Sequence, residues 1–380
     1  MSPVNRKEYY MIYLDNNATT PIDKQVADSM LPFIFDNFGN PSSSHELGVT
    51  TKRAVEQSRK KVADLLNCQS EEIIFTSGGS EANNMVIKGV AYSYKNKGNH
   101  IITSQIEHPA VLNPCKYLER LGYEISYVPV DPYGIINITS LEKLITDKTI
   151  LVTIMHSNNE SGTLQPIKEI SDICHKHNIL FHTDASQSIG KVPVDVKELG
   201  IDFLTVAGHK LYAPKGIGAL YVRKGISIEP LIHGAGHESG RRAGTENIIF
   251  DVALGKACEI AKEALKSDSL KLMTEYFYNS LKENFGEIIV LNGHPEKRLP
   301  NTLNISFIGF NGHEVLNGLD DVAASTGSAC HSGLTTISPV LKAMGVSDEV
   351  GHGAVRFSLG RFTTKDEIDT VISKLYKVLR

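Results

Sequence analysis

Short apolar runs alternate with amphipathic stretches along the first two thirds of the chain. Runs of strand length occur at residues 72–76, 100–103, 124–128, 150–155 and 179–182, and segments with helical spacing, such as 52–66, lie between them. Alternation of this kind predicts a parallel sheet covered by helices on both faces. The sequence therefore predicts an α/β fold.

The pattern changes after Asn247. A long helical stretch runs to about Phe285, an apolar run follows at residues 302–307, and a last helix is expected from Lys365. A chain of 380 residues, of which 41% are hydrophobic, can bury more than one core. We predict a large domain over residues 17–255 and a smaller α+β domain built from residues 1–16 and 256–380.

Composition excludes several classes of protein. The formal net charge of −4 gives no broad basic surface for a nucleic acid. No apolar run approaches the roughly 20 residues that span a bilayer, and the first ten residues lack the apolar stretch of a secretory signal. The five cysteines contain no CxxC pair and the 14 histidines no HExxH motif, which argues against disulfides and against a metal site. We expect a cytoplasmic protein that binds neither membranes nor metals.

Two successive strands end in residues that suggest a cofactor. The run that begins at Ile201 leads to Lys210, and the run before it ends at Asp184. In open parallel sheets ligands bind at the carboxyl ends of the strands, so both side chains are expected at one crevice. Pyridoxal phosphate needs a lysine for a Schiff base and a carboxylate beside its ring nitrogen. The alternatives are a surface lysine beside a turn and an aspartate that only caps the next helix.

The stretch at residues 75–84 predicts a phosphate site. A strand gives way through Gly78 and Gly79 to a helix, and exposed N–H groups at a helix N-terminus favour anions. The hydroxyl of Ser80 adds a donor. A plain helix N-cap is the alternative.

Two further strand ends are expected to converge on the same crevice. His108 follows one strand, where its ring can lie on an aromatic cofactor, although a structural histidine is the alternative. Asn159 follows another strand, where its amide can bind a phenolic oxygen or a carboxylate.

The chain resembles the cysteine desulfurases of the class V aminotransferase family, whose near cousins include the selenocysteine lyases. The resemblance implies a fold-type I transferase that depends on pyridoxal 5'-phosphate, with a mainly parallel seven-stranded sheet. It also implies a homodimer that converts L-cysteine to L-alanine and leaves a persulfide for a sulfur-acceptor protein, in iron-sulfur cluster or thio-cofactor biosynthesis. The resemblance covers nearly the whole chain, through motifs at residues 13–21, 38–43, 75–84, 107–108, 158–160, 182–187, 208–210, 242–247, 327–332 and 355–364.

The resemblance implies contacts to the cofactor ring. Lys210 would hold pyridoxal phosphate as a Schiff base and move the substrate's Cα proton. Asp184 would meet the ring nitrogen and Gln187 the phenolic oxygen, while His108 would stack on the ring and take part in proton transfer.

The phosphate contacts implied by the resemblance are those of Gly79, Ser80 and His209, with Thr245 reaching the phosphate of the neighbouring subunit. One departure stands three residues before the lysine, where the family often has a phosphate-binding serine and this chain has Ala207. One hydrogen bond to the phosphate is therefore expected to be missing, at a net cost of about 1 kcal/mol.

Two residues near the C-terminus are implied to handle the substrate. Cys330 matches the catalytic cysteine and lies among small and polar residues, with His331 beside it to support a thiolate. A buried cysteine that only packs is the alternative. Arg356 lies in an alternating segment and would hold the substrate carboxylate, with Asn159 also at the substrate. An arginine that faces solvent or pairs with an acid is the alternative.

Two other functions stay open from the sequence, a selenocysteine lyase that releases selenide and an inert scaffold that binds the cofactor without turnover. Residues 330–332 and Ala207 resemble the lyases, but those enzymes carry an acidic residue after the stacking histidine, and here that residue is Pro109. A carboxylate at that point would disfavour a nearby thiolate. We therefore predict that L-cysteine is a substrate and that L-selenocysteine is also accepted.

Overall fold

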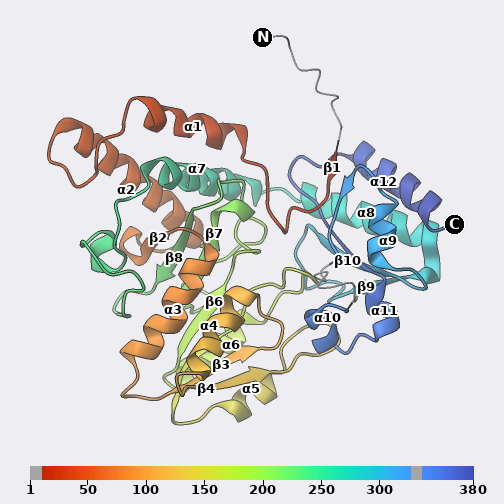
Figure 1. The fold of residues 1–380 in the computed structure, drawn as a ribbon, viewed down its shortest axis with the longest axis horizontal. Coiled ribbons are helices and arrows are strands. Elements are labelled where there is room, and N and C mark those ends of the chain that lie inside the picture. The colour runs from red at the N-terminus through yellow and green to blue at the C-terminus, as the bar shows by residue number, and fades with distance from the viewer. Residues whose placement is uncertain (1–10, 327–335) are drawn as a thin grey trace.

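A computed structural model describes residues 11–326 and 336–380, and the fold has two parts. A large α/β part carries the central sheet, and a smaller part holds the last helices. The N-terminal segment runs between the two parts (Figure 1). The predicted α/β class with a second α+β unit is confirmed.

The central sheet has seven strands in the order β2-β8-β7-β6-β5-β3-β4. Only β8 among them runs against its neighbours, so the sheet is mainly parallel, as predicted. The strands are β2 (Ile73–Thr76), β3 (His100–Ser104), β4 (Glu124–Val128), β5 (Thr149–Thr153), β6 (Leu180–Asp184), β7 (Phe203–Ala207) and β8 (Gly218–Val222).

Helices cover both faces of this sheet because side chains alternate along its strands. Ile73 and Phe75 of β2 pack into a core with α2, α5, α6 and α7, while Ile74 packs into a core with α3 and α4 on the other face. The helices of this part are α1 (Lys24–Phe35), α2 (Glu46–Leu66), α3 (Gly79–Ser93), α4 (Pro109–Glu119), α5 (Ile138–Leu144), α6 (Ile167–Lys176) and α7 (Ile248–Ala264).

Strand β8 was not anticipated, because Gly218 and Ala219 continue a stretch of Pro and Gly that is typical of a turn. The structure explains why residue 218 is a glycine. A Cβ atom there would lie 2.5 Å from the carbonyl oxygen of Val206 and 2.7 Å from the Cα of Gly78. Glycine thus lets β8 pass close to the loop that opens α3.

The smaller part is built on an antiparallel sheet in the order β12-β10-β9, next to a parallel pair formed by β1 and β11. Its core contains Phe277 of α8, Phe307 of β10 and Phe357 of β12. Its elements are β1 (Ile12–Tyr13), α8 (Ser269–Phe285), β9 (Ile289–Asn292), β10 (Thr302–Phe307), α9 (Gly312–Asn317), β11 (Val322–Ala323), α10 (Pro339–Ala343), α11 (Asp348–His352), β12 (Ala354–Ser358) and α12 (Lys365–Val378).

The long helical stretch expected after Asn247 is two helices, and the prediction of one continuous stretch was wrong. Helix α7 ends at Ala264 and α8 begins at Ser269. The polar residues Ser267 and Asp268 separate them, and such residues favour caps and turns over helix interiors. The predicted division at residue 255 falls inside α7, whose buried Ala257 and Cys258 belong to the core of the large part.

Among residues 11–326 and 336–380, no helix combines the length and the apolar composition needed to cross a bilayer.

Candidate functional site

The predicted site residues follow the carboxyl ends of neighbouring strands. In the order β7-β6-β5-β3, these strands are followed by or end in Lys210, Asp184, Asn159 and His108. Because parallel strands end at the same edge, the four residues come from one edge of the sheet. Their charges also act on one another, since both Asp184 and Lys210 affect the pKa of His108.

Lys210 ends a single 3₁₀ turn, Gly208–Lys210, directly after β7. Its ammonium group donates to the backbone carbonyls of Asn17 and of Ala18, the latter at 2.7 Å. Burial, followed by the charge of the Arg356 guanidinium, lowers the pKa of Lys210 from 10.5 to about 8. About a tenth of this lysine is therefore an uncharged amine at pH 7.

Asp184 is the last residue of β6 and is only 7% exposed. One carboxylate oxygen accepts from the side-chain amide of Asn83 at 2.7 Å, and the other accepts from the backbone N–H of Ser186 at 3.0 Å. These two donors fix the carboxylate and leave lone pairs for another donor. Asn83 lies on α3, one turn after Gly79, and sequence reasoning gave it no role.

His108 is the N-cap of α4, and its Nδ1 accepts from the backbone N–H of Ala110 at 3.1 Å. Nδ1 therefore carries no proton, and a neutral ring carries its proton on Nε2. Burial lowers the pKa of His108, which keeps the ring neutral near pH 7. A neutral ring with one N–H suits both stacking and proton transfer.

The phosphate-binding residues lie at the start of α3 and beside Lys210. No side chain caps the N-terminus of α3, so its first N–H groups are left for an anion. Ser80 in this first turn is exposed and lines a cavity of about 440 Å³ together with His108. His209 is neutral because burial, followed by the charge of Lys210, lowers its pKa to about 4. A cofactor phosphate has donors here in the backbone, in the hydroxyl of Ser80 and in a neutral imidazole.

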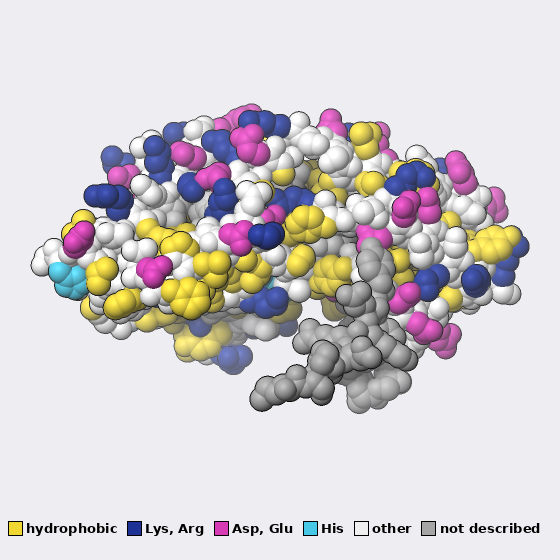
Figure 2. Space-filling model, turned by 90° about the horizontal axis from the view of Figure 1, so that it is seen from above, with side chains coloured by type: hydrophobic (Ala, Val, Ile, Leu, Met, Phe, Trp, Pro, Cys, Tyr) yellow, Lys and Arg dark blue, Asp and Glu magenta, His cyan; other side chains and the backbone are white. Residues whose placement is uncertain are grey.

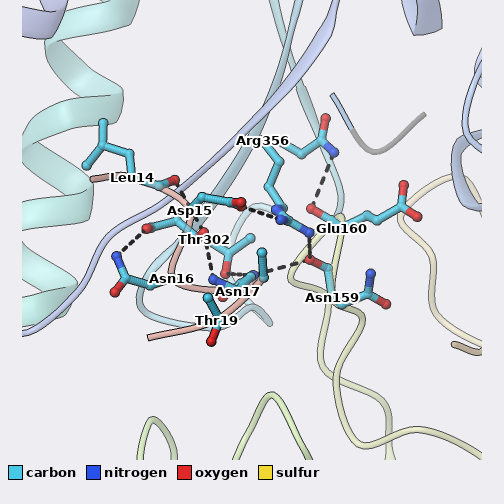
Figure 3. A network of polar contacts seen from close by, with 12 residues as sticks. Leu14, Asp15, Asn16, Asn17, Thr19, Asn159, Glu160, Thr302 and Arg356 are labelled. Atoms are coloured by element: carbon cyan, nitrogen blue, oxygen red, sulfur yellow. Dashed lines mark hydrogen bonds and ion pairs between the residues drawn. The ribbon is translucent and has the colours of Figure 1, made fainter. Parts of the chain in front are cut away.

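Arg356 reaches the site from β12 in the smaller part (Figure 3). The side chain is buried, with the residue 5% exposed, and it forms an ion pair of 2.6 Å with Asp15. It also donates to the backbone carbonyl of Asn159 at 3.0 Å. Within the part of the chain that the structure describes, its Nε has no hydrogen-bond partner. The pairing with an acid, which the sequence left open as the alternative, is present, yet one donor of the guanidinium is unfilled.

Asn17 connects the two parts of the site, and sequence reasoning gave it no role. Its side-chain amide donates to Thr302 of β10 at 2.9 Å and to the carbonyl of Asn159 at 3.2 Å (Figure 3). Its own backbone carbonyl accepts from Lys210 and from the side chain of Gln187, the latter at 2.9 Å. The sequence marked this region through the mostly polar run at residues 15–20 and through the family motif at residues 13–21, but neither assigned a role to Asn17.

Cys330 lies outside the described residues, but the chain on each side of residues 327–335 is held at this site. Ser325 exchanges two backbone hydrogen bonds with Arg356, at 3.1 and 2.6 Å. Ser338 donates its hydroxyl hydrogen to the carboxylate of Glu160. Both flanks of the segment that contains Cys330 therefore contact residues of the site.

Thr245 takes part in none of the contacts described above. It lies in an exposed turn before α7. The sequence placed it against a neighbouring subunit, and its exposure is compatible with such a position.

The residues present fit pyridoxal phosphate. A fixed and buried carboxylate, a lysine with a lowered pKa and an uncapped helix N-terminus occur together, and these are the groups that the ring nitrogen, the aldehyde and the phosphate require. Position 207, three residues before the lysine, is an alanine and offers no hydroxyl. The hydroxyl of Ser186 lies near this point, 3.1 Å from where a Cβ atom on Gly79 would be.

Comparison with known proteins gives consistent matches over nearly the whole chain. The family model described as "Aminotransferase class-V" matches residues 12–371. A protein named cysteine desulfurase IscS from Dictyoglomus turgidum is 47% identical over 97% of this chain and 94% of its own length. Another of the same name, from Methanosarcina thermophila, is 48% identical over 97% of this chain and 92% of its own length.

Solved structures agree with these matches. A structure titled "NIFS-LIKE PROTEIN" superposes with a TM-score of 0.91 at 38% identity, covering 97% of this chain and 99% of that chain. A structure titled "SspA in complex with cysteine" has a TM-score of 0.83 at 39% identity and covers 93% of this chain and 100% of that chain.

Proposed function

Because the chain belongs to the class-V aminotransferase family, and within it to the cysteine desulfurases, we propose that it converts L-cysteine to L-alanine and leaves the sulfur as a persulfide on Cys330. The enzyme depends on pyridoxal phosphate, which supplies an electron sink for negative charge at the substrate's Cα when it is bound. The overall reaction balances: the Cβ–S bond of cysteine breaks, an S–S bond to Cys330 forms, and the carbon keeps the electron pair and takes a proton.

The observation that carries the proposal is the joining of Lys210 and Arg356 through Asn17. An α-amino acid offers an amine and a carboxylate on one carbon, and the site offers a lysine that can hold an aldehyde cofactor for the amine and a partly unfilled guanidinium for the carboxylate. Asn17 accepts from Lys210 and donates to the same Asn159 carbonyl that accepts from Arg356. Asn17 therefore links the residue proposed for the amine end of the substrate to the residue proposed for its carboxylate.

The chain's own residues divide the remaining work. Lys210, part of which is neutral near pH 7, is the base for the Cα proton, and Asp184 supplies negative charge beside the ring nitrogen. His108 carries a proton on Nε2 and accepts a backbone bond on Nδ1, so it exchanges protons through Nε2 alone. Gln187 is the residue proposed for the phenolic oxygen, and Asn159 lies with Arg356 on the substrate side.

We propose that L-cysteine is the preferred substrate over L-selenocysteine. The curated relatives are named cysteine desulfurase, and one similar structure holds cysteine. Pro109, which follows His108, brings no carboxylate to the site. We propose that selenocysteine is also turned over, because its selenol ionises more readily and needs less help to leave.

A homodimer is the proposed assembly. Large apolar side chains are exposed along α1 and the turn after it, with Phe35 at 71% and Phe38 at 70%, and Leu31 and Ile34 close to half exposed. Figure 2, which views the molecule from the side of α1, shows hydrophobic side chains gathered along one edge of that face. Contiguous exposed apolar surface of this kind is typical of subunit interfaces. The proposed dimer also gives Thr245 a neighbouring phosphate to reach.

A sulfur-acceptor protein and a cytoplasmic location complete the proposal. The persulfide needs an acceptor, whose identity the site does not specify. The described cysteines, Cys68, Cys115, Cys174 and Cys258, are all unpaired thiols, which supports a reducing compartment.

The test is to measure alanine formed from L-cysteine with a reductant present, and to locate the persulfide by mass spectrometry. The wild type should form alanine and carry the extra sulfur on Cys330. Cys330→Ala should bind the cofactor, keep its visible absorbance and carry no persulfide. Alanine from selenocysteine but not from cysteine would establish the lyase instead, and cofactor binding without alanine from either would establish an inert scaffold.

A further inference from the structure

A second partly buried lysine lies beside the cofactor site. Lys191 lies in the turn that follows β6, four residues after Gln187. Its ammonium group donates to the side-chain oxygen of Gln187 at 3.0 Å and to the side-chain oxygen of Asn17 at 3.2 Å. It therefore contacts a residue proposed for the cofactor and the residue that joins Lys210 to Arg356.

The contact with Lys191 decides which way the amide of Gln187 points. The backbone carbonyl of Asn17 can only accept a hydrogen bond, and it receives one from the Nε2 of Gln187 at 2.9 Å. A charged lysine can only donate, so it requires the Oε1 of the same amide. One orientation satisfies both neighbours: Oε1 faces Lys191, and the N–H₂ group, with one hydrogen still free, faces the site.

Lys191 brings positive charge without a counter-ion. Among the described residues no carboxylate forms an ion pair with it, although Lys24, Lys61 and other lysines on the surface have such partners. Burial, followed by the charges of Lys210 and Arg356, lowers the pKa of Lys191 to about 7, so about half of this lysine is charged at pH 7. An ammonium group in this place gains from any negative charge that enters the site.

We propose that Lys191 is a positioning residue, which holds the amide of Gln187 with its N–H₂ group toward the phenolic oxygen of the cofactor and places an unpaired positive charge behind it. The inference rests on the proposed use of pyridoxal phosphate. It extends that proposal because the orientation of Gln187 and the charge behind it both depend on a residue that does not itself reach the cofactor.

Both effects act in the same direction on the linkage between Lys210 and the cofactor. An N–H donor on the phenolic oxygen competes with the proton of that linkage, and a nearby positive charge disfavours this proton. Lys191 therefore lowers the pH at which the linkage loses its proton. A lysine with a purely structural role would not move that pH.

The experiment compares Lys191→Met with the wild type, both loaded with pyridoxal phosphate, by titrating the visible absorbance with pH. Methionine keeps the length and apolar stem but neither donates nor carries charge. We expect the midpoint to rise by about 0.5 pH unit or more. Lys197→Met, on the exposed surface six residues further along, is the matched control and should leave the midpoint unchanged.

A double variant tests whether Lys191 acts through Gln187. In a Gln187→Leu background there is no amide to orient, so adding Lys191→Met should shift the midpoint less than it does in the wild type. Lys191→Arg keeps the donors and the charge and should return the midpoint toward that of the wild type.

An unchanged midpoint in Lys191→Met, with the variant folded and loaded, would overturn the proposal. So would equal shifts in the presence and absence of Gln187, because the amide would then be irrelevant. If Lys191→Met fails to fold, the Lys191→Gln variant, which removes the charge but keeps a donor, must raise the midpoint by a smaller amount, or the proposal fails. The titration needs no turnover, so a protein that makes no alanine from cysteine would refute the proposed reaction while leaving this result intact.

Discussion

The lowered pKa of Lys210 predicts how fast the cofactor-free protein takes up pyridoxal phosphate at each pH. The uncharged amine is the form that attacks the aldehyde. At pH 7.5 a lysine with a pKa of about 8 is about one quarter uncharged. A lysine with the ordinary pKa of 10.5 is uncharged in only about one part in a thousand. The structure therefore predicts an advantage of roughly two hundredfold in reactive amine.

The perturbation is Arg356→Gln, which removes the main neighbouring charge that lowers the pKa. Burial, the larger cause, stays in place, so the pKa should rise only part of the way toward 10.5. The freed carboxylate of Asp15 acts in the same direction, because its negative charge raises the pKa of Lys210. We expect a rise of roughly half a unit to one unit.

The assay is stopped-flow absorbance, in which cofactor-free protein is mixed with pyridoxal phosphate between pH 6 and pH 10. A small lysine derivative, measured in parallel, corrects for the ionisation of the cofactor. The wild-type rate should level off above pH 8, and the variant should level off at a higher pH. A wild-type rate that keeps rising to pH 10 would show that Lys210 is not desolvated as the structure has it. Equal midpoints in the two proteins would refute the role of Arg356.

Three further outcomes follow from the site and the surface. Arg356→Lys should raise the KM for cysteine by roughly ten- to a hundredfold in steady-state assays, because one ammonium cannot replace a planar guanidinium on a carboxylate; an unchanged KM would place the carboxylate elsewhere. Burial raises the pKa of Glu107 to about 8, so its contribution to stability is complete below pH 4.5 and is lost as the pH rises through 8. Glu107→Gln cannot ionise, and its melting temperature relative to the wild type should therefore increase from pH 5 to pH 9; a constant difference would mean that the wild-type carboxyl ionises normally. Replacing Phe35 and Phe38 together by Glu should halve the mass in light scattering and weaken cofactor binding, whereas an intact dimer would exclude this face from the interface.

The sequence predicted the fold class and most strands because the central sheet is buried on both faces. Strands such as 149–153 and 203–207 are mostly apolar runs with polar residues within three positions of their ends, and that pattern can be read without knowledge of contacts. Strand β8 escaped because its glycine is required by a close approach of the loop at Gly78, which no local pattern reveals. The break between α7 and α8 was missed because helical spacing continues on both sides of it.

Some residues of the site could be predicted from the sequence and others could not. The places of Lys210, Asp184 and His108 at strand ends were predictable because the sequence marks the end of each strand. Asn17 and Lys191 were not, since their importance lies in hydrogen bonds to residues 142 to 285 positions away in one case and to a turn amide in the other. Polar residues that hold other polar residues leave no periodic signal.

The two carbonyls that receive the Lys210 ammonium have a thermodynamic consequence for the whole molecule. They belong to residues 17 and 18, a few positions after β1, and β1 is held in the smaller part by its pairing with β11. When Lys210 binds a cofactor, these two carbonyls lose their hydrogen-bond donor. Cofactor binding therefore weakens the contact between Lys210 and residues 17 and 18, which link the two parts. Because such coupling is reciprocal, hydrogen bonds that hold residues 17 and 18 in place must in turn oppose the release of Lys210 to the cofactor. The affinity for the cofactor and the stability of the contact between the two parts of the fold therefore share one coupling free energy.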